Sequence, residues 1–252
     1  MKNSLILLKE NLKYVIESQR FRFIILSLIC INLFGTAYLA YNTNYIDGIL
    51  TVVTNNYYVA LLISLILTNA ISTYEMFEKN SFYLIRFNNR SEYLKKLIQN
   101  IVAINIVVMI LNLLLLLIGL NIFNGNGLII ETVDHYNLSN AAYVSFYLIR
   151  FVILVQIICV LSILILKLVN FKLVLILDII LILFIMVYPN PSPSPVEKIP
   201  DMFIFVGEYF RFHPYSNFAF EVLCSTIYIS ALVTVTWVLF KLSERFMKRV
   251  GI

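Results

Sequence analysis

Two ionisable residues, Arg150 and Asp178, lie inside stretches of sequence that are otherwise apolar. A charged side chain at the centre of a membrane costs roughly 2.5–3.5 kcal/mol on insertion scales, so each of them needs a partner or a task. Arg150 follows the start of its stretch closely, and its long side chain can extend outward to the interface. Asp178 follows Lys172 by about 9 Å of helical rise and is near the opposite edge. A direct pair between the two is therefore not expected.

Asp178 can instead meet one of the lysines that border the apolar stretches, namely Lys167, Lys172 or Lys241. A single acid makes a poor proton relay, because a relay passes a proton along several groups. We therefore favour a structural ion pair for Asp178 over a role in proton transfer.

Uncharged polar residues inside the apolar stretches follow a helical spacing. Asn105, Met109 and Asn112 share one face of a predicted helix, at intervals of four and three residues. Polar side chains avoid lipid, so this face should look into a helical bundle or toward a partner subunit. The surrounding residues are mainly Leu, Ile, Val and Phe. Such an interior suits an apolar or amphipathic cargo better than a hydrated ion.

Motifs for catalysis or nucleotide binding are missing. The sequence has no phosphate-binding Gly-x-x-x-x-Gly-Lys-Ser/Thr loop, no His-Glu-x-x-His and no Gly-x-Ser-x-Gly. The three cysteines and two histidines have no ligand spacing, so neither a metal site nor a cofactor is predicted. A weaker alternative is an intramembrane hydrolase that uses Glu208 and His213.

The elements that position these residues are apolar helices. The chain is 61% hydrophobic and only 13% charged. A membrane core about 30 Å thick needs about 20 apolar residues in a helix. These lengths predict an all-α integral membrane protein, with one domain over residues 1–252 and six transmembrane helices, at about 23–41, 57–73, 97–120, 143–166, 173–188 and 222–240.

Basic residues predict the orientation of these helices. Of the 19 Lys and Arg residues, sixteen fall in the segments 1–22, 74–96, 167–172 and 241–252. Basic residues near the ends of spans stay in the cytosol. Both termini and the 74–96 connection are thus expected on the cytosolic side of the cell membrane. The basic residues form no single stripe, so a nucleic-acid partner is not expected.

Three further segments have helical or interfacial character. Residues 1–22 have apolar and basic faces, which is typical of a helix lying along the lipid bilayer. Residues 76–87 fit a short amphipathic helix rich in aromatic residues, which either contact a protein or rest among lipid headgroups. The segment 189–221 begins with alternating prolines and is too interrupted to cross, so it should re-enter the outer interface.

This layout resembles that of the type-2 ATP-binding-cassette (ABC) exporter permeases. The similarity is sharpest where Glu78 precedes the short helix and where the stretch from Arg90 to Lys96 is similar to the Arg-x-x-Tyr-x-x-Lys stretch of that family. Pro200 and the His213-Pro214-Tyr215 turn are similar to its re-entrant element. Bacterial permeases that export peptides, including lantibiotic-immunity and phenol-soluble-modulin exporters, have a similar size and layout.

The resemblance implies a division of labour between subunits. A separate cytosolic ATPase would bind ATP and Mg, a second permease copy, identical or related, would complete the transporter, and an amphipathic peptide or other lipophilic compound would be exported. A membrane protein that captures a peptide without pumping, for immunity or sensing, is the alternative. The helix 76–87 would be the coupling helix that docks on the ATPase, with contacts from Phe77, Glu78, Phe82, Tyr83, Arg86 and Arg90.

Overall fold

The described part of the chain is almost entirely helical. The computed structural model describes residues 13, 15–40, 45–53, 55–79, 90–123, 132–133, 138–169, 171–187 and 218–249. These residues form the helices α2 (Gln19–Leu39), α3 (Tyr45–Val53), α4 (Asn56–Lys79), α6 (Arg90–Phe123), α7 (Asn140–Leu168), α8 (Phe171–Val187) and α10 (Phe218–Arg249). Two short strands, β1 (Thr132–Val133) and β2 (Leu138–Ser139), pair antiparallel.

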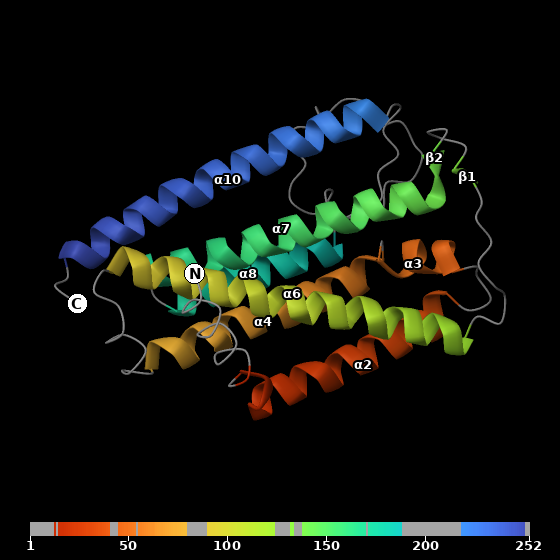
Figure 1. Cartoon of the computed structure of the whole chain (residues 1–252), viewed down its shortest axis with the longest axis horizontal. Helices are drawn as coiled ribbons and strands as arrows, with labels where there is room; N and C mark the ends of the chain where they lie inside the picture. Colours follow the sequence, from red (N-terminus) through yellow and green to blue (C-terminus); the bar gives the residue numbers. More distant parts are fainter. Residues whose placement is uncertain are drawn as a thin grey trace.

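The long helices run side by side along the longest axis of the molecule (Figure 1). Helix α10 follows one edge of this bundle and α2 the opposite edge, while α3 and the β1–β2 pair gather at one end. An α-helix satisfies its own backbone hydrogen bonds, which is why apolar segments can cross lipid in this form.

Among the described residues, five helices are long and apolar enough to cross a membrane: Gln19–Leu39, Tyr57–Glu78, Glu92–Phe123, Val144–Leu168 and Glu221–Arg245. The prediction of a helical protein with several membrane-span-like segments is thereby confirmed. The predicted fifth span, 173–188, corresponds to α8, which has 17 residues. That length is about 26 Å by helical rise, slightly less than the hydrocarbon core of a bilayer.

Several boundaries differ from those predicted. The leading helix does not continue to residue 22, because Ser18 caps the start of α2 by accepting a hydrogen bond from the Phe21 amide at 3.2 Å. Helix α4 continues to Lys79, so residues 76–79 extend the second span and do not begin a separate helix. Residues 45–53, predicted only as part of a connection, form α3. Most of the predicted re-entrant segment, 189–217, lies outside the described residues.

The apolar core is shared by α2, α3, α4, α6 and α7. Helices α8 and α10 are more peripheral, with α8 packing mainly on α4 and α10 mainly on α7. In the apolar part of α7, 61% of the residues are buried, but in that of α10 only 6% are. Helix α10 therefore buries fewer of its side chains within this chain than α7 does, although Tyr228, Ile229 and Leu232 pack against the core.

Helices α2 and α6 cross closely because Gly119 has no side chain. A Cβ at residue 119 would lie 2.5 Å from the Thr36 hydroxyl oxygen and 3.0 Å from its methyl carbon. Small residues let membrane helices approach each other in this way, which increases their van der Waals contact.

We expect Gly119→Ala to lower the free energy of unfolding by about 1–3 kcal/mol, the range for an overpacked interior. Unfolding in mixed detergent micelles, followed by helical circular dichroism, measures this loss. Thr36→Ala removes the two closest atoms and should recover much of it. Gly35→Ala is the milder control, since its Cβ would approach no described atom closer than 3.2 Å. Full stability of Gly119→Ala, or a loss that Thr36→Ala does not reduce, would contradict the close crossing.

Candidate functional site

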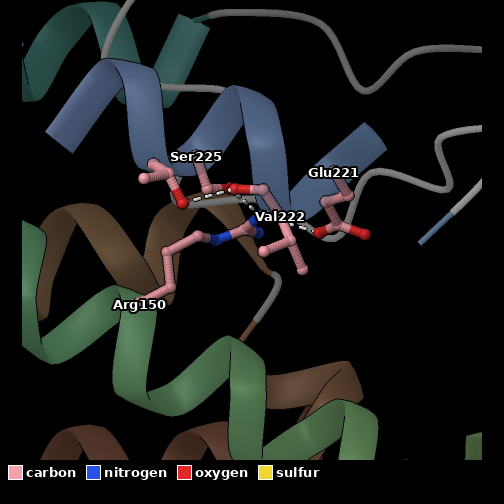
Figure 2. Close-up of polar contacts among 5 residues, drawn as sticks. Arg150, Glu221, Val222 and Ser225 are labelled. Carbon is pink, nitrogen blue, oxygen red and sulfur yellow. Dashed lines mark hydrogen bonds and ion pairs between the residues drawn. The ribbon is translucent and has the colours of Figure 1, made fainter. Parts of the chain in front are cut away.

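A buried ion pair joins α7 to α10. The Arg150 Nη1 atom lies 2.7 Å from Glu221 Oε1, and the side chains are 2% and 0% exposed (Figure 2). Arg150 also donates to the Ser225 hydroxyl at 3.3 Å, one turn further along α10. Arg150, which was predicted to extend outward to the interface, is buried against an acidic partner in the first turn of α10.

Aromatic rings surround this ion pair. The guanidinium carbon of Arg150 lies 5.6 Å from the ring centroid of Phe146 and 5.3 Å from that of Tyr147. Cations placed this way over aromatic faces are stabilised by the ring quadrupole. Phe146 in turn meets Phe218 of α10 edge-to-face, at a centroid distance of 5.2 Å. The rings thus form a second contact between α7 and α10.

The residues that α10 buries are polar. Among its described residues, those fully buried are Glu221, Ser225 and Ser243, whereas many of its large apolar side chains are exposed. Breaking a buried ion pair leaves an uncompensated charge and costs far more than the intact pair contributes. Removal of one member of the pair with Arg150 should therefore strongly disturb this end of α10.

Neutral amides form a second polar cluster, between α2, α4 and α6. Asn32 donates to Asn112 at 2.8 Å, and the Tyr58 hydroxyl donates to Asn32 at 2.9 Å and accepts from Asn112 at 3.1 Å. Deeper along the same helices, Asn69 donates to Asn105 at 2.8 Å. The two asparagines of α6 thus lie inside the bundle, on the face where the sequence pattern places them. These bonds pair most of the buried amide groups, but the Asn105 amide nitrogen has no hydrogen-bond partner among the described residues.

Asp178 links α8 to α7 through a hydrogen bond and not through an ion pair. The Ser162 hydroxyl donates to Asp178 Oδ1 at 2.8 Å, while the buried Oδ2 has no hydrogen-bond partner among the described residues. The predicted ion pair of Asp178 with Lys167, Lys172 or Lys241 is not formed among the described residues; Lys167 pairs with Glu78 and Lys241 with Glu244.

A fourth cluster ties the end of α4 to α6 and α7. Lys167 of α7 forms an ion pair with Glu78, the penultimate residue of α4. The same ammonium group lies 5.0 Å from the ring centroid of Tyr74 and 5.8 Å from that of Tyr93, on α4 and α6. Three helices thus meet at one lysine, near the end of α4, after which the connection 80–89 follows in the sequence.

The structure places only part of the predicted ATPase-docking set. Phe77 is 2% exposed and packs in the core of this chain, so it is not a surface contact. Glu78 is half-exposed and paired with Lys167. Arg90 is the first residue of α6, but its side chain lies outside the described part. Phe82, Tyr83 and Arg86, with the alternative pair Glu208 and His213, also lie outside the described residues.

These clusters have the chemistry of helix pairing. In the part of the chain that the structure describes, no three His, Cys, Asp or Glu side chains gather as possible metal ligands. Comparison of the chain with protein-family models, with curated proteins and with solved structures finds no match. The polar clusters, and the connection 80–89 that follows one of them in sequence, are therefore the features of this chain that bear on its function.

Glu221 is the residue that sequence reasoning missed, because it immediately precedes the predicted span 222–240 and was counted as outer loop. The signal that could have identified Glu221 is its level along the bundle axis. Arg150 lies toward the start of α7, at the end of the bundle where α10 also begins. An acid in the first turn of α10 is thus within reach of an arginine at that level.

We predict that Arg150→Met lowers the free energy of unfolding by about 3–5 kcal/mol, because it leaves the Glu221 carboxylate buried without a counter-charge. The double variant Arg150→Met/Glu221→Leu should recover most of this loss. Equilibrium unfolding in mixed micelles provides the double-mutant cycle. The control Lys13→Met removes an exposed pair with Glu17, whose contribution should stay below about 1 kcal/mol. If the double variant loses as much unfolding free energy as Arg150→Met and Glu221→Leu lose together, the two residues do not act as a pair.

Proposed function

We propose that the chain is the transmembrane permease subunit of an ABC exporter. In this proposal α8 is the fifth of six membrane spans, and both termini and the connection 80–89 lie in the cytosol. A separate ATPase binds ATP and Mg²⁺ and docks on that connection. Two permease copies and two ATPases make the working transporter, which extrudes an amphipathic peptide or another lipophilic compound.

The observation that carries this proposal is the cluster beside the connection 80–89. An exporter must convert movement of a cytosolic partner into movement of its spans, and this requires a rigid link. Glu78 and Lys167 join α4 to α7 at this point, with Tyr93 of α6 adjoining the lysine. At the same end, Arg20 of α2 lies 3.9 Å from Glu75 of α4. A force on the connection would thus act on several spans together.

The character of the bundle interior supports a lipophilic cargo. Its described polar groups are mostly neutral amides and hydroxyls, and the charges of Arg150 and Glu221 compensate each other. Ion pathways in membranes use side chains of one charge or backbone carbonyls along a wet channel. The described interior instead consists mainly of leucine, isoleucine and valine side chains.

A reconstituted complex tests the proposal. The tagged chain, co-expressed with an ATPase encoded beside it, is placed in lipid vesicles, and ATP hydrolysis and movement of a fluorescent amphipathic helical peptide are measured. Phe82→Ala/Arg86→Ala should release the ATPase and abolish ATP-driven movement. An ATPase that stays bound with transport unchanged would contradict the proposal. Peptide binding without an ATPase, unaffected by ATP depletion, would favour the non-pumping alternative.

A second arm of the same experiment separates docking from coupling. Glu78→Gln removes the ion pair with Lys167, so the ATPase should remain bound and active while transport falls several-fold. The reversed pair Glu78→Lys/Lys167→Glu should restore part of the transport. Glu92→Gln, an exposed acid in the first turn of α6, is the matched control. If Glu78→Gln and Glu92→Gln lower transport equally, the cluster around Lys167 has no specific role in coupling.

A further inference from the structure

Beyond the end held by Arg150, α10 leaves a cleft against α6 and α7. The cleft has a volume of about 430 Å³ and is open at the surface of the described chain. Sites that hold small molecules in proteins span about 300–1,000 Å³, so there is room for one extended chain. Its apolar walls come from all three helices and include Ile98, Val160, Leu164, Val233 and Phe240.

The walls favour hydrocarbon as the occupant. Gln156 also lines the cleft, but its amide nitrogen is directed to the sulfur of Met109 at 3.7 Å. With these helices in a bilayer, a cleft between them would be open to the acyl chains of lipids. An acyl chain matches the mainly apolar surface of the cleft. The buried Gln156 Oε1 has no hydrogen-bond partner among the described residues and gains none from hydrocarbon.

One charge stands at the mouth of the cleft. Lys95, near the start of α6, is the charged residue among those lining it. Its side chain is exposed and forms no ion pair with any described carboxylate, including Glu92 one turn earlier. A lysine at a span end buries its carbon chain and extends its ammonium group to the headgroup level. There the ammonium group should favour an anionic lipid over a zwitterionic one by about fivefold for each basic residue.

We infer that this cleft binds one anionic phospholipid, with an acyl chain between α6 and α10 and the phosphate at Lys95. The lipid belongs to the leaflet on the side where α6 begins, which is the cytosolic leaflet in the proposed orientation. The inference does not depend on ATP-driven export, because it requires only that these helices lie in a bilayer.

The single tryptophan of the chain makes the site measurable. Trp237, the only tryptophan among the 252 residues, lines the cleft and is 60% exposed. Bromine atoms on an acyl chain quench tryptophan fluorescence at contact. The full chain is placed in phosphatidylcholine vesicles that contain a small fraction of either brominated phosphatidylglycerol or brominated phosphatidylcholine. The anionic lipid should quench Trp237 at about one fifth of the concentration that the zwitterionic lipid needs.

Two pairs of variants test whether the quenching of Trp237 by anionic lipid comes from this cleft. Lys95→Ala should remove the preference for phosphatidylglycerol, whereas Lys96→Ala, its neighbour outside the cleft, should keep it. Val160→Phe fills the cleft and should weaken quenching by the anionic lipid, whereas Ile153→Phe on an exposed face of α7 should not. Circular dichroism verifies that each variant is folded.

Three results would overturn the inference. The first is equal quenching by the two brominated lipids in the unsubstituted chain, which would mean that bulk hydrocarbon fills the cleft. The second is the same headgroup preference in Lys95→Ala and Lys96→Ala. The third is loss of quenching when an amphipathic peptide is added at a concentration that leaves the lipid fractions unchanged, which would assign the cleft to peptide.

Discussion

The ion pair between Arg150 and Glu221 is the interaction on which the placement of α10 depends. Hydrocarbon offers no water to either charge, so each must find its partner inside the protein. The pair lies at the end of the bundle where α10 begins, and Ser225 and the ring of Phe146 add further contacts there. Because α10 buries few apolar side chains, the ion pair is the main polar contact at this end, beside the edge-to-face packing of Phe146 on Phe218.

The bundle thus has a well-packed core and two helices, α8 and α10, that are attached more lightly. Helices α2, α4 and α6 share an apolar core and are pinned by amide hydrogen bonds such as that between Asn32 and Asn112. Helix α8 is attached by packing on α4 and by the Ser162–Asp178 hydrogen bond. Elements with few buried contacts open most easily. Motion of the spans, whatever drives it, is therefore expected first in α8 and α10.

The sequence predicted the helices better than it predicted their partners. Long runs of Leu, Ile and Val determine where a helix can cross, and the spacing of Asn105 and Asn112 identified an inward face. Ends were less predictable, because the cap at Ser18 and the continuation of α4 to Lys79 depend on local hydrogen bonds and on packing. Helix α3 was missed since nine residues are too few to span a membrane.

Partners that are distant in sequence could not be read from periodicity at all. Glu78 and Lys167 are 89 positions apart, and Arg150 and Glu221 are 71 apart. Helical spacing shows which face a residue occupies but not which helix faces it. Asp178 illustrates this limit, because three lysines were considered as its partners and the structure gives it the hydroxyl of Ser162.

The most direct test of the account is a distance measurement across the α7–α10 contact in lipid. In a background without the native cysteines, spin labels at residues 149 and 223, both exposed, report the separation of the two helices by pulsed electron paramagnetic resonance. A single narrow distribution that broadens when Glu221 is replaced by Leu is the predicted result. A distribution that is equally narrow with and without Glu221 would show that something other than the ion pair holds α10.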